Sequence, residues 1–94
     1  MNTYRLKLFI TGQTANSDLA IANLKELFDQ SHIDYELSIV DVLEHPGLAE
    51  KERVMATPTL IKLSPPPVRR IIGDFSDTQR VIIGLGLYNT QRKS

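Results

Sequence analysis

No cysteine and no tryptophan occur in this sequence, and its aromatic residues are three tyrosines and three phenylalanines. Without cysteine the chain cannot form disulfide bonds, thiolate nucleophiles or cysteine-ligated metal sites. No apolar run approaches the ~20 residues that a transmembrane helix needs, and no segment has the pattern of a signal peptide. These absences predict a cytoplasmic protein that carries out no thiol redox chemistry.

Neither sign of charge is in excess, because eleven basic and eleven acidic residues cancel. Their distribution is nevertheless uneven: residues 1–47 have a net charge of −4 and residues 48–94 a net charge of +4. Nucleic-acid binding favours a stronger basic excess, so the pattern suits self-association or docking on an acidic protein. Two solvated faces of opposite sign explain it equally well. At 94 residues, with 41% apolar and 23% charged residues, we expect one globular domain spanning residues 1–94.

The N-terminal half has the pattern of a βαβ unit. Apolar and basic residues alternate from Tyr4 to Ile10, with Phe9 as the exception, which predicts a strand. A helix is expected from a cap at Asn16 or Ser17 to about Gln30, because one apolar stripe runs along it: Ala20, Ile21, Leu24, Leu27 and Phe28. A second strand follows at 35–42, and its inward residues are expected to be Tyr35, Leu37 and Ile39.

Residues 52–77 hold four of the five prolines and cannot form one helix, because each proline removes a backbone donor. A short charged helix is expected at 48–54, after Pro46 at a first helical position. Apolar strands are then predicted at 59–63 and 68–72, separated by the block Pro65, Pro66 and Pro67 and ended by Gly73. Asp74 and Ser76 are candidate caps for the last segment.

The last segment, 77–88, fits two structures. As a helix it places Val81, Ile82, Leu85 and Tyr88 on one side, and as a strand it alternates Val81, Ile83, Leu85 and Leu87. The β-branched residues favour a strand, whereas Gly84 and Gly86 weaken both forms. We expect alanine at both glycines to favour the helix by ~1–2 kcal/mol. The local sequence leaves the choice to tertiary context.

The sequence carries no recognisable catalytic site. Phosphate-binding, nucleophile-elbow and zinc-protease motifs are absent, and His32 and His45 lack the spacing of a metal pair. The pairs Asp41 with Glu44 and Asp74 with Asp77 lie at turns or helix starts, where capping explains them better than acid–base catalysis. We therefore expect no enzyme activity, no cofactor and no metal. Arg69 and Arg70 are candidates for docking a partner, with solvated strand-edge charges as the alternative.

Thr57-Pro58 suggests a specific fold. A βαβ unit, a short helix and then Thr-Pro before a strand is the order of a thioredoxin-like domain, in which a cis-proline precedes that strand. The loop after the first strand, where thioredoxins carry their redox cysteines, reads Thr11 to Ser17 and contains no thiol. Disulfide exchange requires a thiolate, so this chain would keep the scaffold without that chemistry.

The sequence as a whole resembles the KaiB family of circadian clock proteins. The segments that carry the resemblance are KLFITGQTANS, YELSIVDVLEHPGLAE and, most specifically, ATPTLIKLSPPPVRRIIGDFSD. The resemblance implies a non-enzymatic protein that binds the ring of the ATPase and kinase KaiC. It also implies that the protein helps to sequester KaiA, promotes KaiC dephosphorylation and competes with an output histidine kinase. KaiB proteins switch between a homotetrameric ground state and a thioredoxin-like monomer by refolding their C-terminal half.

The resemblance also assigns residues. Arg53, Arg69, Arg70 and Asp74 match partner-binding positions, and the joint that would allow the switch includes Pro58, Pro65, Pro66, Pro67, Gly73, Gly84 and Gly86. This chain departs from clock members at Ala15, at Asp18-Leu19 and at Ser38, where they carry proline or basic residues, and at Gly86, where aspartate is common. Those at Asp18-Leu19 and Ser38, where clock members are basic, remove positive charge. They leave open an alternative, in which a KaiB paralogue of dimeric or tetrameric ground state acts as an adaptor in stress response or signalling outside the core clock.

Overall fold

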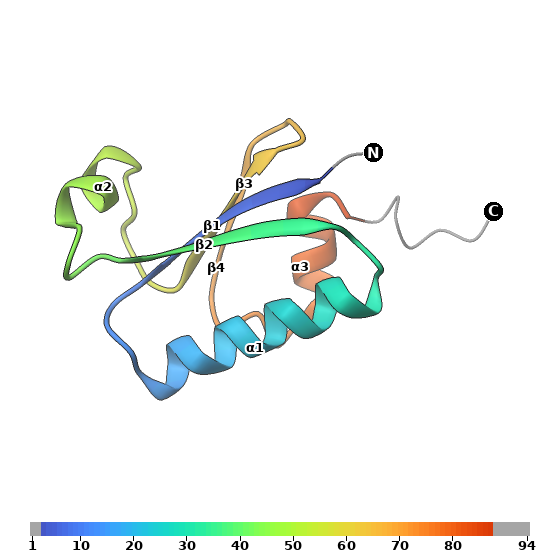
Figure 1. Cartoon of the computed structure of the whole chain (residues 1–94), viewed down its shortest axis with the longest axis horizontal. Coiled ribbons are helices and arrows are strands. Elements are labelled where there is room, and N and C mark those ends of the chain that lie inside the picture. The colour runs from blue at the N-terminus through green and yellow to red at the C-terminus, as the bar shows by residue number, and fades with distance from the viewer. Residues whose placement is uncertain (1–2, 88–94) are drawn as a thin grey trace.

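The computed structural model describes residues 3–87. Seven elements follow one another along the chain (Figure 1). They are β1 (Tyr4–Ile10), α1 (Ala15–Gln30), β2 (Tyr35–Asp41), α2 (Pro46–Lys51), β3 (Thr59–Ser64), β4 (Arg69–Ile72) and α3 (Thr78–Leu85). The expected βαβ half is confirmed. Of the two patterns that fit residues 77–88, the structure adopts the helix up to Leu85; Tyr88 lies outside the described residues.

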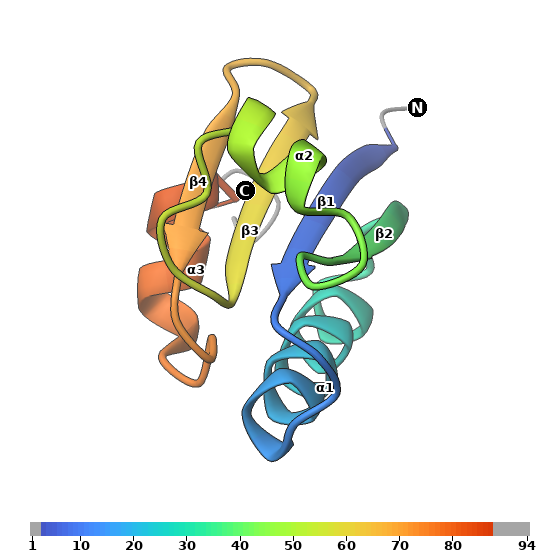
Figure 2. The same ribbon diagram turned by 90° about the vertical axis from the view of Figure 1, so that its left-hand side faces the viewer.

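The four strands form one sheet in the order β2-β1-β3-β4. β1 and β2 are parallel and are joined by α1, whereas β3 pairs antiparallel with both β1 and β4. Helices α1 and α3 cover one face of the sheet, and α2 lies on the other face near one end (Figures 1 and 2). This arrangement leaves β2 and β4 as the two edge strands.

Two apolar clusters hold these layers together. The larger lies between the sheet and helices α1 and α3 and includes Leu8, Phe28 and Leu85. The smaller consists of Phe9, Val40 and Ile61, packed against apolar residues of α2 and its flanking segments. Phe9 breaks the alternation of β1 because its side chain points to the α2 face, where it is completely buried. The stripe predicted for α1 is confirmed, since Ala20, Leu24, Leu27 and Phe28 are buried in the larger cluster.

Several predicted boundaries and caps are wrong. Thr14, not Asn16 or Ser17, caps α1, and Ser17 completes a capping box with it. Asp77, not Asp74 or Ser76, caps α3 by accepting a hydrogen bond from the Arg80 amide. Pro46 begins α2, as its predicted first helical position requires, but the helix ends at Lys51 and not at residue 54, because the following residues turn toward β3, where Val54 packs on Phe9's cluster. Ile39, expected to point inward, is 46% exposed, since β2 is an edge strand.

Gly86 lies just beyond α3 and not within a regular helix. It adopts a left-handed conformation with φ of +73°, and its backbone N–H donates to the last turn. The expectation that alanine at this position favours the helix is therefore wrong, because a Cβ disfavours left-handed φ. We expect Gly86→Ala to reduce the free energy of unfolding by about 1 kcal/mol and Gly86→Asn by less. Urea denaturation of the two variants tests this; equal effects of alanine and asparagine would contradict it.

Gly84 lies inside α3, where it packs against β4. A Cβ added there would lie 2.5 Å from Cδ1 and 2.9 Å from Cγ1 of Ile71, so that side chain would have to move. Alanine gains about 1 kcal/mol of helix propensity, but overpacking costs about 1–3 kcal/mol. Because Ile71 is half-buried on an edge strand and can turn aside, we expect Gly84→Ala to change stability little.

The same substitution should stabilise the fold once Ile71 is shortened. In an Ile71→Ala background the obstructing atoms are gone, so Gly84→Ala should add about 1 kcal/mol to the free energy of unfolding. A double-mutant cycle in urea measures this coupling. The contact with Ile71 would be unimportant if Gly84→Ala had the same effect in both backgrounds.

Candidate partner-binding surface

β4 places the two predicted docking arginines on opposite faces of the sheet. Successive residues of a strand point to opposite faces, and Arg69 pairs with Lys62 whereas Arg70 pairs with Ile61 of the α2 face. Both arginines are exposed. They therefore cannot act as one adjacent basic pair.

Arg70 is engaged within the chain. Its two terminal nitrogens donate to the backbone carbonyls of Glu52 at 2.8 Å and Arg53 at 3.2 Å. Arg53, the predicted contact residue after α2, has a φ of +58°. Arg70 thus joins β4 to the carboxyl end of α2 and brings Arg53 beside it, although the two are separated by seventeen positions in the sequence. These contacts give Arg70 a structural role on the α2 face, which differs from a purely solvated strand-edge charge, and docking on a partner stays a prediction.

Arg69 lies beside Lys62, a residue that the sequence interpretation did not single out. Lys62 interrupts the apolar run of β3, and this charged residue within an apolar strand is the sequence signal that could have identified it. Its side chain is buried, and its Nζ lies 5.7 Å from the centre of the Tyr4 ring. Burial, and then the neighbouring Arg69 charge, lower the pKa of Lys62 below its ordinary value. The two cations make this part of the β3–β4 hairpin electropositive.

Asp74 lies away from the three arginines, in the turn between β4 and α3. Its carboxylate accepts a hydrogen bond from the Ser76 amide at 3.0 Å, and its carbonyl accepts one from Nδ2 of Asn23 at 2.9 Å. The bonds from Ser76 lower the pKa of the Asp74 carboxyl. Asp74 therefore fixes the turn that leads into α3 and links it to α1.

The lowered pKa of Asp74 predicts an acid-dependent loss of stability. Its contribution is fully present above the unfolded pKa of about 3.9 and is lost as the pH falls further, through the folded pKa. We expect an NMR titration to place the Asp74 midpoint below that of an aspartate in an unfolded peptide. The loss of stability between about pH 5 and pH 2 should be smaller in Asp74→Asn than in the parent chain. A parallel loss in both would contradict this role.

The residues predicted to form a hinge lie at three separate places. The Thr57-Pro58 bond is cis, and the Pro58 carbonyl accepts a hydrogen bond from Gly73, which joins the start of β3 to the end of β4. The block Pro65–Pro67 forms the tip of the β3–β4 hairpin, at the opposite end of both strands. Gly84 and Gly86 belong to α3 and its cap.

The remaining polar candidates have structural roles. Asp41 accepts hydrogen bonds from the amides of Gly12 and Leu43, and Asp77 caps α3, as capping predicts. His45 occupies the cap position of α2 without a side-chain bond, and His32 is exposed after α1. Within residues 3–87 no group of three or more histidine and acidic side chains is arranged to hold a metal ion. The helices in this range include none with the length and hydropathy to cross a membrane.

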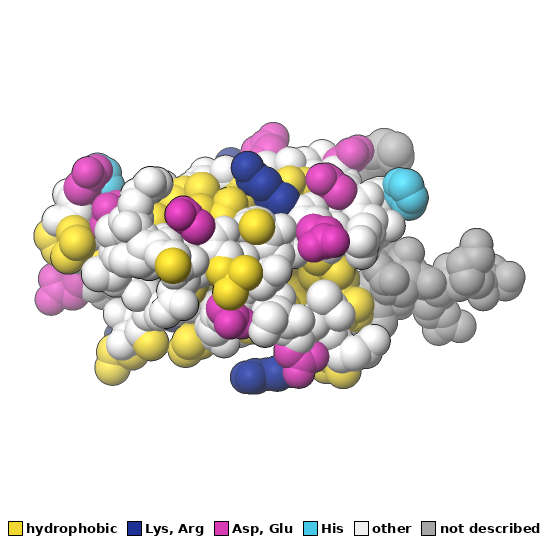
Figure 3. Space-filling view, turned by 90° about the horizontal axis from the view of Figure 1, so that it is seen from below, with side chains coloured by type: hydrophobic (Ala, Val, Ile, Leu, Met, Phe, Trp, Pro, Cys, Tyr) yellow, Lys and Arg dark blue, Asp and Glu magenta, His cyan; other side chains and the backbone are white. Residues whose placement is uncertain are grey.

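The two faces of the molecule differ in charge. Acidic side chains outnumber basic ones on the face formed by α1 and α3 (Figure 3). The α2 face carries the exposed Arg53 and Arg70, and the outward residues of β1 there are Arg5 and Lys7. Arg5 is paired with Glu36 of β2 at 3.7 Å. The same region also exposes Glu44 and Glu50, so a partner that meets the α2 face encounters charges of both signs.

Comparison with known proteins now decides the family. Residues 7–87 match the KaiB domain. The chain belongs to the KaiB family. It is 52% identical over 86 residues to the circadian clock oscillator protein KaiB of Trichodesmium erythraeum. The aligned region covers 90% of this chain and 83% of that relative. The identity and both shares are the same for the circadian clock oscillator protein KaiB of Nostoc punctiforme.

Solved structures establish the fold of this KaiB-family protein. The N-terminal domain of Synechococcus elongatus SasA superposes with a TM-score of 0.77 at 21% identity, covering 100% of this chain and 90% of that domain. Mitochondrial thioredoxin 3 of Saccharomyces cerevisiae superposes with a TM-score of 0.69 at 21% identity, covering 92% of this chain and 79% of that one. The predicted thioredoxin-like α/β fold is confirmed in this arrangement.

Proposed function

We propose that this KaiB-family protein is a non-enzymatic regulator of a circadian clock that binds a KaiC-type ATPase and kinase ring. The observation that carries the proposal is the 52% identity to clock oscillator proteins over 90% of the chain. The thioredoxin-like arrangement adds support, because in the KaiB family that arrangement is associated with KaiC binding. The chain also lacks the cysteines that a thioredoxin uses, which supports a binding role over catalysis.

The proposed surface for KaiC is the α2 face together with the β3–β4 hairpin. Arg53 and Arg70 are held together on the α2 face, and Arg69 places positive charge beside Lys62 on the opposite face of the same hairpin. Bound to KaiC, the protein would help to sequester KaiA, promote KaiC dephosphorylation and displace an output histidine kinase. Asp74 would contribute by fixing the turn before α3.

A refolding of the C-terminal half is part of the proposal. Residues 81–87, helical for most of their length here, would become a strand in a dimeric or tetrameric ground state. The joints would be Pro58 with Gly73, the hairpin tip at Pro65–Pro67, and Gly84 with Gly86. Two sets of NMR signals for this half, whose ratio changes with protein concentration, would support the switch. A single set at all concentrations would contradict it.

The test of the clock role is a mixing experiment. The protein is incubated with a KaiC homologue, and samples taken over a day are separated by size exclusion and native mass spectrometry. We expect a complex that accumulates over hours. Arg53→Ala and Arg69→Ala should weaken it, whereas Lys25→Ala, on the exposed side of α1, should not. Arg70→Ala requires a parallel stability measurement, because Arg70 also supports the fold.

An adaptor role outside the core clock is the second candidate. It is favoured by the positions at which clock members are basic, since this chain has exposed Asp18 and Ser38 there. Absence of a KaiC complex after overnight incubation, with other proteins retrieved in a pull-down, would favour the adaptor. A complex with KaiC that is lost in Arg53→Ala would exclude it as the main role.

A further inference from the structure

Met55 is the most exposed large apolar side chain among residues 3–87, at 91%, and the next is Leu43 at 68%. It lies in the segment between α2 and β3, two positions after Arg53. The chain contains two methionines and no cysteine, and the other methionine, Met1, lies outside the described residues. The thioether of Met55 is therefore a sulfur atom that a dissolved oxidant reaches without any opening of the fold.

Met55 belongs to a group of apolar side chains around α2, at the end of the molecule that faces the viewer in Figure 2. It lines a hollow of about 220 Å³ together with Val42 and Ala49, which are next in sequence to the exposed Leu43 and Leu48. Exposed apolar side chains that gather in one place mark interaction surfaces, in which methionine and arginine are enriched. The group therefore supplies an apolar part of the α2 face on which docking is proposed.

Oxidation changes this side chain from apolar to polar. Hydrogen peroxide transfers one oxygen atom to a thioether: the O–O bond breaks, an S–O bond forms, the sulfur is oxidised to a sulfoxide and the peroxide is reduced to water. We propose that Met55 is a site of reversible oxidation by peroxides, and that its sulfoxide weakens docking of the α2 face on a KaiC-type ring. A sulfoxide buried at an interface loses its hydrogen bonds with water, whereas an apolar thioether gains from burial.

The fold itself tolerates this oxidation. Neither apolar cluster includes Met55, and its side chain is surrounded by water in the free protein. Oxidation of a buried methionine disrupts a core, but here the added oxygen leaves the buried side chains in place. We expect the thermal midpoint of the oxidised protein to lie within about 2 °C of that of the untreated protein.

The docking half of this inference rests on the proposed function and adds a means of regulating it. The oxidation half needs no partner, because the rate at which Met55 is oxidised is measured on the protein alone. Complex formation by the untreated protein tests the proposed function, whereas the difference between untreated and oxidised protein tests the role of Met55. Failure of one is therefore distinguishable from failure of the other.

The experiment treats the full chain with hydrogen peroxide and follows the oxidation by mass spectrometry of digests. Met55 should be oxidised at a rate within about threefold of that of N-acetylmethionine amide. After catalase has removed the peroxide, the protein is mixed with a KaiC homologue and the complex is quantified by size exclusion. We expect an affinity at least about fivefold lower than that of the untreated protein. Methionine sulfoxide reductases that act on both epimers should restore it.

Two variants locate the effect. Met55→Leu keeps an apolar side chain without sulfur, so peroxide should change its affinity for KaiC less than about twofold. Met55→Leu combined with Ile83→Met moves the exposed thioether to α3, on the other face of the sheet, at a position that is 67% exposed. Its introduced thioether should be oxidised at a similar rate, again with less than about a twofold change in affinity.

Three results would overturn the inference. They are oxidation of Met55 more than about tenfold slower than that of N-acetylmethionine amide, equal affinity of oxidised and untreated protein, and an equal peroxide effect in Met55→Leu. No complex with the untreated protein would contradict the proposed function and the docking half together, while the oxidation rate still decides the other half.

Discussion

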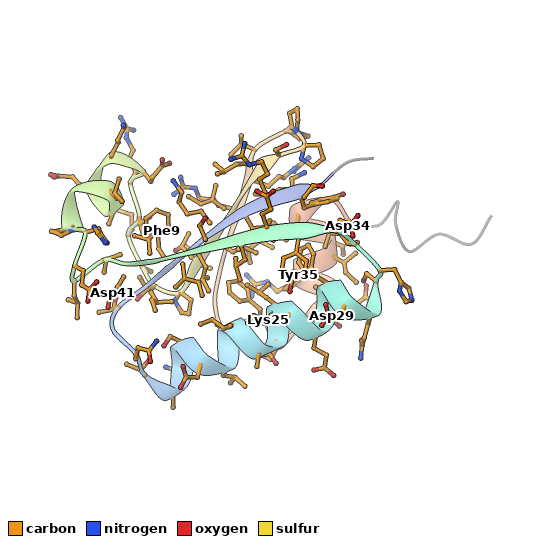
Figure 4. The ribbon with its side chains drawn as sticks, viewed as in Figure 1. Phe9, Lys25, Asp29, Asp34, Tyr35 and Asp41 are labelled. Atoms are coloured by element: carbon orange, nitrogen blue, oxygen red, sulfur yellow. The ribbon has the colours of Figure 1, made fainter. Side chains whose placement is uncertain are left out.

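Replacing Phe9 with alanine is expected to reduce the free energy of unfolding by about 3–5 kcal/mol, a large part of the about 5–15 kcal/mol typical of a domain. The side chain is completely buried on the α2 side of the sheet (Figure 4). It forms the centre of the smaller cluster with Val40 and Ile61, and Ala49 and Val54 pack against it. Removing the ring leaves a cavity that these side chains cannot fill, because each is held by the backbone of its strand, of α2 or of the segment that follows α2.

The loss of stability in Phe9→Ala should be largest near the substituted side chain. Because Phe9 lies where α2 packs on the sheet, we expect amide exchange in α2 to accelerate more in Phe9→Ala than exchange in α1. Phe9→Leu should lose less than about 1.5 kcal/mol, since it nearly conserves volume. Leu43→Ala is the surface control, and its effect should lie within about 0.5 kcal/mol. A loss in Phe9→Ala no larger than in Leu43→Ala would show that this cluster contributes nothing to stability.

Replacing Asp41 with alanine is expected to cost about 2 kcal/mol. One carboxylate oxygen accepts hydrogen bonds from the backbone amides of Gly12 at 3.0 Å and Leu43 at 2.9 Å. These bonds tie the end of β2 to the β1–α1 loop, where Figure 4 shows Asp41. Alanine leaves the partly buried Gly12 amide without its acceptor, and hydrogen bonds to charged groups contribute more than neutral ones.

Asp41→Asn is the matched control, because it keeps an acceptor oxygen and removes the charge. It should lose about half as much stability as Asp41→Ala in urea denaturation. Hydrogen exchange at the Gly12 amide should accelerate in the alanine variant and less in the asparagine variant. An alanine variant as stable as the parent chain would show that the loop is held by other contacts, such as the Thr11–Thr57 bond.

The local sequence was sufficient for the N-terminal half because its signals agree with one another. The alternation of β1 and the apolar stripe of α1 predicted both elements and most of their buried residues. The exceptions have physical causes. Phe9 departs from the alternation because α2 covers the second face, and Ile39 is half-exposed because β2 is an edge strand of the sheet formed by the described residues.

The sequence predicted which residues belong to the candidate surface, but it did not predict how they are arranged in space. Arg69 and Arg70 are adjacent in sequence, yet the period of a strand separates them onto two faces. Arg70 meets Arg53 because β4 and the end of α2 converge, which no local pattern encodes. Lys62 was missed because a lysine in a strand ordinarily points to solvent, whereas here the Tyr4 ring covers it.

The sequence by itself determined the absence of thiol chemistry, the βαβ half, the position of the Thr57-Pro58 turn and the resemblance to the KaiB family. It left residues 77–88 compatible with both a helix and a strand, since their apolar residues fall on one side at the period of either structure. Tertiary structure decided between them: as a helix the segment packs against β4 with Val81 and Leu85 in the core, and Asp77 and Gly86 cap its two ends. The reason is that a segment with balanced local preferences takes the form that buries more apolar surface against its neighbours.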